Sequence, residues 1–181
     1  MSRPSLWRPL FLTGMMGAGK STVGKLMASR AAVVFVDLDR RIERVTGRGV
    51  ATLIAGGVDV FRRWEHAALR SLVAEPGFTH LGSVVATGGG VVEDPRNLVL
   101  MRSAGAVAYL AVPIEILVQR LSRDTEQASR PLLDPGSLRE SIVWRLAERE
   151  SAYNTADLRV DGGQAPAQVV DRILAAVRER T

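Results

Sequence analysis

The chain carries near its start the stretch Pro9-Leu10-Phe11-Leu12-Thr13-Gly14-Met15-Met16-Gly17-Ala18-Gly19-Lys20-Ser21, whose last eight residues match the pattern G-x-x-x-x-G-K-[ST]. A short apolar run precedes the pattern and a helical stretch over 22–30 follows it, which is the strand–loop–helix context that the pattern requires. The glycines let backbone N–H groups surround phosphates, and the helix adds its positive N-terminal end. We therefore expect a phosphate-binding loop. The alternative is a glycine-rich turn that only caps the helix.

The pattern predicts a role for each of its polar residues. Lys20 should reach the β- and γ-phosphates of a nucleotide, and the hydroxyl of Ser21 should ligate Mg²⁺. The loop and the first helical turn are expected to contact ATP through Gly17, Ala18, Gly19, Lys20, Ser21 and Thr22.

Outward from this loop, apolar runs alternate with helical stretches, which predicts an α/β fold with a mostly parallel sheet. Five strands are expected, over 10–13, 33–36, 83–86, 106–112 and 158–160. Helices are expected over 20–30, 38–46, 50–55, 62–75, 95–103, 113–121, 138–153 and 166–180. The polar segment 122–137 shows no periodicity and is predicted to form a mobile lid. A length of 181 residues predicts a single domain over 1–181.

Composition excludes several classes of protein. The chain has no cysteine, so disulfides, thiolate zinc sites and a cysteine nucleophile are excluded. The net charge is +5, but the arginines are spread along the chain without interleaved aromatic residues, so we expect no nucleic-acid partner. Arginine also suits small anions such as nucleotides. We find no targeting segment and no apolar run long enough to span a membrane, and we expect a cytoplasmic protein.

The remainder of the sequence narrows the class of nucleotide-binding protein. A regulatory GTPase needs a lysine-containing guanine-binding motif downstream, and no lysine follows Lys25. A motor or AAA-type ATPase needs a strand that ends in Asp-Glu, and that dipeptide does not occur. A compact kinase of nucleosides or small metabolites remains.

Two carboxylates follow the second predicted strand, at Asp37 and Asp39. They would lie beside the phosphate loop if this strand lies near the first. Asp37 suits the shell of a magnesium ion, and Asp39 suits a hydrogen bond from the attacking hydroxyl, which it would orient or deprotonate. The alternative is a helix cap that only satisfies backbone N–H groups.

Further along the chain, charged residues and glycines indicate an acid-binding pocket. Arg62 begins a predicted helix, with Glu65 one turn later as its partner. Three glycines, Gly88, Gly89 and Gly90, follow a predicted strand, at the end of the sheet where ligands bind in open α/β folds. A tight connection is the alternative for these glycines.

Two arginines remain as candidates. Arg130 lies in the predicted lid, where closure would bring it to the transferred phosphoryl group and exclude water. A solvated arginine is the alternative. Arg149 lies four residues before Tyr153 on one helix face and is a candidate second arginine for a carboxylate.

In order along the chain, the phosphate loop, Asp-Leu-Asp (37–39), Phe-Arg-x-x-Glu (61–65), Gly-Gly-Gly (88–90), Arg-Pro-Leu-Leu (130–133) and Arg-x-x-x-Tyr (149–153) resemble the shikimate kinase family. The resemblance implies a P-loop fold of three αβα layers, like that of the nucleoside monophosphate kinases. It implies that Asp39 contacts the substrate hydroxyls, that Arg62 and Arg149 hold the substrate carboxylate, and that 88–90 line the same pocket. It also implies that Asp37 belongs to the magnesium shell, that Lys20 and Arg130 contact the transferring phosphate, and that Arg120 and Pro166 flank adenine. The segment Gly57-Val58-Asp59-Val60 departs from the Gly-Glu that family members often show there.

The implied reaction converts ATP and shikimate into ADP and shikimate 3-phosphate, a step toward chorismate and the aromatic amino acids, with Mg²⁺ as the metal and a monomer as the expected state. Catalysis would rest on positioning and electrostatic stabilisation. Two alternatives stay open: a related small-metabolite or nucleoside monophosphate kinase, and a non-catalytic nucleotide-binding relative.

Overall fold

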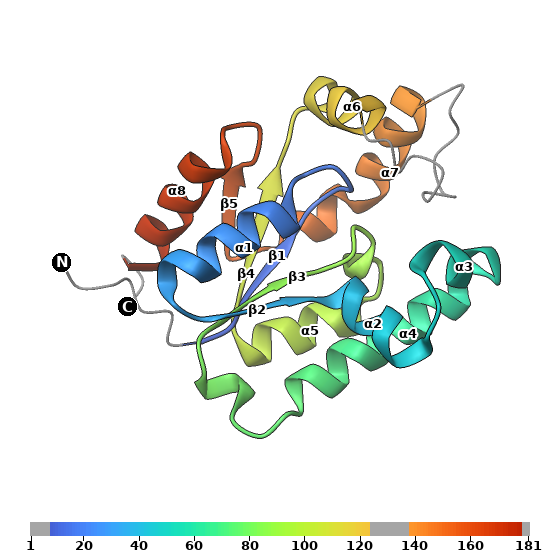
Figure 1. Cartoon of the computed structure of the whole chain (residues 1–181). Coiled ribbons are helices and arrows are strands. Elements are labelled where there is room, and N and C mark those ends of the chain that lie inside the picture. Colours follow the sequence, from blue (N-terminus) through green and yellow to red (C-terminus); the bar gives the residue numbers. More distant parts are fainter. Residues whose placement is uncertain (1–7, 124–137, 179–181) are drawn as a thin grey trace.

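The computed structural model describes residues 8–123 and 138–178. Its centre is a five-stranded sheet in which every pair of neighbouring strands is parallel (Figure 1). The strands are β1 (Leu10–Thr13), β2 (Val34–Asp37), β3 (Ser83–Ala86), β4 (Ala106–Ala111) and β5 (Leu158–Asp161), and their order in the sheet is β2-β3-β1-β4-β5. The predicted five-stranded parallel sheet is confirmed. The second strand along the chain, β2, is not the direct neighbour of β1, because β3 lies between them.

The helices are α1 (Lys20–Ala31), α2 (Leu38–Thr46), α3 (Val50–Ala55), α4 (Val58–Val73), α5 (Pro95–Ala104), α6 (Ile114–Arg123), α7 (Leu138–Tyr153) and α8 (Pro166–Arg178), with short 3₁₀ helices η1 (Phe78–His80) and η2 (Val91–Glu93). Most match the predicted helices within two residues. Helix α4 begins four residues before the predicted start at Arg62, and the two 3₁₀ helices were not predicted. Of the predicted lid, residues 122–123 end α6, while 124–137 lie outside the described residues.

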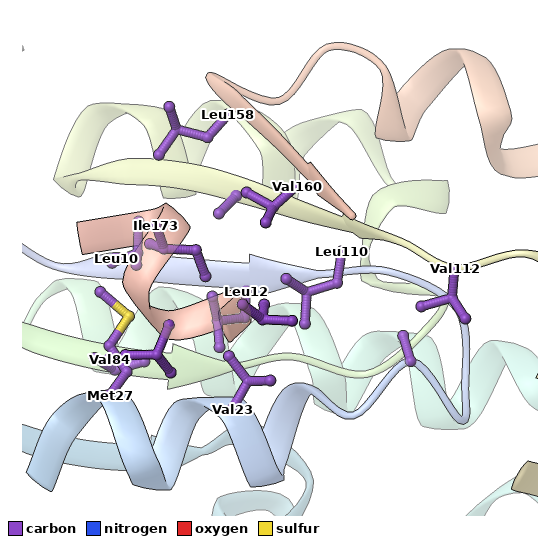
Figure 2. Close-up of a cluster of buried hydrophobic side chains, with 14 of the residues drawn as sticks. Leu10, Leu12, Val23, Met27, Val84, Leu110, Val112, Leu158, Val160 and Ile173 are labelled. Atoms are coloured by element: carbon purple, nitrogen blue, oxygen red, sulfur yellow. The ribbon is translucent and has the colours of Figure 1, made fainter. Parts of the chain in front are cut away.

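Helices cover both faces of the sheet, as the predicted three-layer αβα architecture requires. One face packs against α1, α6 and α8, and Figure 2 shows side chains of this cluster, including Met27 of α1, Leu110 of β4 and Ile173 of α8. The other face packs against α2, α4 and α5, with Tyr153 of α7 in the same cluster. The three-layer prediction is confirmed.

The central strand β1 leads directly into the predicted phosphate-binding loop. All four of its residues are buried, as expected for a parallel strand covered on both faces. Three segments lie at the carboxyl-terminal edge of the sheet: the loop after β1, residues 37–39 at the end of β2, and residues 87–90 after β3. This is the edge where open α/β sheets bind ligands.

Helices that run long and apolar enough to cross a lipid bilayer do not occur in the part of the chain that the structure describes.

Candidate active site

The phosphate-binding loop has the backbone shape that its sequence predicts. Gly17 and Gly19 adopt positive φ angles of 78° and 88°, in the left-handed region that favours glycine. Helix α1 begins directly afterwards at Lys20, so its N-terminal N–H groups open toward the loop. The buried Lys20 side chain folds over the loop, and its Nζ donates to the carbonyl oxygens of Gly14 at 2.7 Å and Met15 at 3.0 Å. An ammonium group is therefore held where phosphates would enter.

Ser21 and Asp37 meet beside this loop. The hydroxyl of Ser21 donates to Oδ2 of Asp37 at 2.8 Å. The other oxygen, Oδ1, accepts from the backbone N–H of Arg40 at 3.3 Å and caps α2. Asp37 thus caps α2, as the alternative interpretation of this residue predicted, and it also contacts Ser21 beside the phosphate-binding loop.

The donor atoms around Ser21 fit magnesium. Mg²⁺ prefers oxygen ligands and takes few of them from protein, with phosphate oxygens and water completing its shell. The hydroxyl of Ser21 and the carboxylate of Asp37 are such oxygens. Within 8–123 and 138–178, the structure contains no group of three or more histidine, cysteine or acidic side chains that could hold a metal ion.

Asp39 lies in the first turn of α2 with an unusual carboxyl group. Its Oδ1 is buried and has no hydrogen-bond partner among the described residues. Burial raises the pKa of Asp39 to about 6, and the charge of Asp37 adds to the rise, while Lys20 and Arg62 oppose it. A buried, unsatisfied acceptor is costly unless a ligand completes it. The carboxyl is therefore suited to accept a hydrogen bond, or a proton, from a bound hydroxyl.

Two arginines and two glutamates form a compact charged group, which we call the arginine clamp: Arg62, Glu65, Glu93 and Arg149. The predicted pairing of Arg62 with Glu65 is confirmed, with Nη1 at 2.7 Å from Oε2. Glu93 contacts both guanidinium groups. Arg149 is buried, with 1% of its side chain exposed. Burial raises the pKa of Glu65 to about 7, against the opposing charge of Arg62.

Gly88 and Gly90 pack against this charged group and leave no room for side chains. A Cβ atom at Gly88 would lie 2.4 Å from Oε1 of Glu65, and one at Gly90 would lie 1.8 Å from Nη2 of Arg62. Between them, the carbonyl of Gly89 accepts a hydrogen bond from the hydroxyl of Tyr153. These glycines do more than connect a strand to a helix, because the guanidinium of Arg62 occupies the space that a side chain would need.

Arg120 and Pro166 line the same cavity as Arg62 and Arg149 of the clamp. Arg120 Nη1 is 3.3 Å from the carbonyl oxygen of Gly17, and Nη2 donates to the carbonyl of Gly162 at 3.1 Å. Pro166 begins α8. Arg130 lies outside the described residues.

A cavity of about 640 Å³ unites these elements. All the predicted site residues that the structure describes line it, namely Gly17, Ala18, Gly19, Lys20, Ser21, Thr22, Asp37, Asp39, Arg62, Gly88, Gly89, Gly90, Arg120, Arg149 and Pro166. Asp59, in the segment that departs from the family pattern, is exposed at the start of α4 and does not line the cavity.

Sequence reasoning missed Glu93. It is the third residue after Gly90 and lies in η2, a single turn too short to show a helical period. Its proximity to the glycine run was the one available signal.

Comparisons with known proteins agree with this geometry. The family model described as shikimate kinase matches residues 16–178. A shikimate kinase of Geobacter sulfurreducens is 44% identical over 99% of this chain and 96% of its own length, and one of Aromatoleum aromaticum is 42% identical over 92% and 93%. The structure of shikimate kinase from Acinetobacter baumannii in complex with shikimate superposes with a TM-score of 0.87 at 30% identity, covering 96% of this chain and 94% of that one. On the match of the family model and the identity to these relatives over nearly their whole length, the chain belongs to the shikimate kinase family.

Proposed function

We propose how this ATP-dependent kinase, which acts on shikimate, uses its cavity. The γ-phosphoryl group of ATP is transferred to the 3-hydroxyl of shikimate, giving ADP and shikimate 3-phosphate. One observation carries the proposal: a single cavity is lined by a phosphate-binding loop, by the unsatisfied carboxyl of Asp39 and by two arginines. A nucleoside monophosphate kinase would have no use for a pair of arginines set aside for a carboxylate.

The acid is held at its carboxylate and aligned at its hydroxyl. Arg62 and Arg149 present planar guanidinium groups, which bind carboxylates through paired N–H donors. Asp39 accepts the hydrogen bond of the 3-hydroxyl and takes its proton as the oxygen bonds to phosphorus. The bond between the γ-phosphorus and the β–γ bridging oxygen breaks, and ADP leaves. Holding both reactants in one site supplies much of the acceleration.

The phosphate side provides electrostatic stabilisation. The Lys20 ammonium and the backbone N–H groups of the loop offset negative charge on the phosphates. Ser21 and Asp37 would hold Mg²⁺, which would neutralise part of the phosphate charge. We assign Arg130 to the transferred phosphoryl group, and Arg120 and Pro166 to the two faces of adenine.

The organisation of the protein completes the proposal. We propose that residues 1–181 form one kinase domain that acts as a monomer in the cytoplasm. The absence of cysteine from the chain suits a reducing compartment.

The deciding experiment measures ADP release by the purified protein with Mg-ATP, with and without shikimate, and with quinate, gluconate or AMP as alternative acceptors. Shikimate-dependent turnover is expected. Turnover with another acceptor alone would show a kinase with a different substrate. ATP binding without turnover on any acceptor would support a non-catalytic relative.

A further inference from the structure

Glu93 joins the two arginines of the clamp. Its Oε2 accepts from Nε of Arg62 at 3.0 Å and lies 3.0 Å from Nη2 of the same residue. Its Oε1 accepts from Nε of Arg149 at 2.7 Å and also contacts Nη2 of that residue. One carboxylate therefore binds two guanidinium groups, each through the edge formed by Nε and Nη2.

This arrangement leaves a second edge on each guanidinium. A guanidinium carries five N–H donors in a plane, and the edge formed by Nη1 and Nη2 is distinct from the edge formed by Nε and Nη2. Nη1 of Arg62 donates one of its two hydrogens to Glu65. Nη1 of Arg149 donates a hydrogen bond to the sulfur of Met15 at 3.6 Å. Each arginine thus keeps donors for a second carboxylate while Glu93 remains bound.

Glu93 makes its contacts from outside the cavity. Both arginines line the cavity, whereas Glu93 is absent from its lining and 36% of its side chain is exposed. A glutamate that occupied the place of a substrate carboxylate would line the cavity. Glu93 therefore holds the two arginines from behind, outside the cavity. We call the group formed by Arg62, Glu93 and Arg149 the brace.

The brace spans three elements of the fold. Arg62 lies on α4, Arg149 on α7 and Glu93 on η2, which packs against both helices. The two guanidinium groups carry like charges and are largely buried, with 17% and 1% of their side chains exposed. Without a shared carboxylate they would repel one another, and the buried cation of Arg149 would lose its ionic partner.

We infer that Glu93 is a positioning residue, which sets the spacing and orientation of Arg62 and Arg149 so that both bind the carboxylate of the acid substrate. The inference rests on the proposed function and adds a residue to it. Removing the negative charge of Glu93 would also strengthen the attraction of the two arginines for any anion, and this would oppose the loss of substrate binding. Loss of geometry outweighs this effect because Glu93 engages two N–H donors of each arginine.

The test is Glu93→Gln, an isosteric change that leaves one acceptor oxygen and turns an amide N–H toward the other guanidinium. The KM for shikimate should rise roughly 10- to 100-fold, as expected for displaced binding groups, with the KM for ATP unchanged. A shikimate analogue with a carboxamide in place of the carboxylate should be used equally by the variant and the parent chain. Glu148→Gln is the matched control, because Glu148 is exposed next to Arg149 and forms no ion pair with either arginine in the described part of the chain.

A lower KM for shikimate in Glu93→Gln would show that Glu93 competes with the substrate, and an unchanged KM would show that the brace is not needed; either result overturns the inference. If Glu93→Gln does not fold, Glu93→Asp keeps the charge with a shorter reach and should raise the same KM, and an unchanged value would overturn the inference equally. Failure of the parent chain to turn over shikimate would instead overturn the proposed function.

Discussion

The hydroxyl of Ser21 donates a 2.8 Å hydrogen bond to Asp37, although the strands that precede these residues, β1 and β2, are separated in the sheet by β3. The contact forms because Ser21 lies in the first turn of α1 and Asp37 ends β2, and both face the carboxyl-terminal edge of the sheet. It joins the phosphate loop to the acidic pair at 37 and 39, and it brings together a hydroxyl and a carboxylate, which are oxygen groups of the kind that Mg²⁺ prefers.

Replacing Ser21 with alanine should weaken the use of magnesium. The variant loses a ligand oxygen and the hydrogen bond that orients Asp37, so the Mg²⁺ concentration for half-maximal activity should rise roughly tenfold or more. Titration of activity with Mg²⁺ at fixed ATP measures this. Ser29→Ala, on the exposed part of α1, is the control and should match the parent chain. An unchanged Mg²⁺ requirement in Ser21→Ala would remove Ser21 from the metal site.

Replacing Asp39 with asparagine should abolish most of the phosphoryl transfer while ATP still binds. The change removes the acceptor for the hydroxyl proton and leaves the phosphate loop intact, so kcat should fall by about 10²- to 10⁴-fold. Steady-state kinetics and ATP-binding calorimetry on the same protein separate the two effects. Equal loss of ATP binding and of transfer would contradict the role assigned to Asp39.

The activity of the parent chain should depend on the ionisation of Asp39. Burial raises the pKa of this carboxyl from 3.8 to about 6, so it holds a proton at pH values where an exposed aspartate has lost one. Only the ionised form accepts a proton from the hydroxyl. We therefore expect kcat/KM for shikimate to be constant above pH 7 and to fall about tenfold per pH unit well below pH 6. A kcat/KM profile from pH 5 to 8 tests this, and the residual activity of Asp39→Asn should lack that fall.

Removing either arginine of the clamp should weaken binding of the acid far more than binding of ATP. Each guanidinium supplies charge-assisted hydrogen bonds, so Arg62→Ala and Arg149→Ala should each raise the KM for shikimate by about 10- to 100-fold. Arg139→Ala, which loses an exposed ion pair with Glu115 on α6, is the control for α7. Unchanged acid affinity in both clamp variants would refute the assignment of these arginines to the carboxylate.

A methyl group at Gly90 should displace Arg62. The backbone of Gly90, at φ −102°, accepts alanine without strain, but the added Cβ would lie 1.8 Å from Nη2 of Arg62. Because Glu65 and Glu93 hold this guanidinium, its displacement should raise the KM for shikimate roughly tenfold or more. Gly49→Ala, whose Cβ would meet its nearest neighbour, Oε1 of Glu43, at 3.9 Å, should be close to neutral. Kinetic parameters equal to those of the parent chain in Gly90→Ala would show that the cavity tolerates the methyl group.

Much of this protein was predictable from short stretches of its sequence. The phosphate loop, the five parallel strands and most helix boundaries follow from glycine placement and apolar periodicity, which act over a few residues. Short motifs of fixed spacing also identified four charged residues of the cavity, Asp37, Asp39, Arg62 and Arg149. The early start of α4 was missed because Val58, Asp59 and Val60 follow two glycines and carry no capping side chain.

The tertiary structure decided what depends on residues far apart in the chain. The insertion of β3 between β1 and β2 results from strand pairing across long loops, which no local pattern encodes. The bridge of Glu93 to Arg149 joins residues 56 positions apart, and its charges became partners only when η2 and α7 packed together. The raised pKa of Asp39 likewise depends on burial by several elements. Sequence alone therefore determined most of the residues that line the cavity. Packing added Glu93 to the arginine clamp, brought the clamp residues into contact and raised the pKa of Asp39.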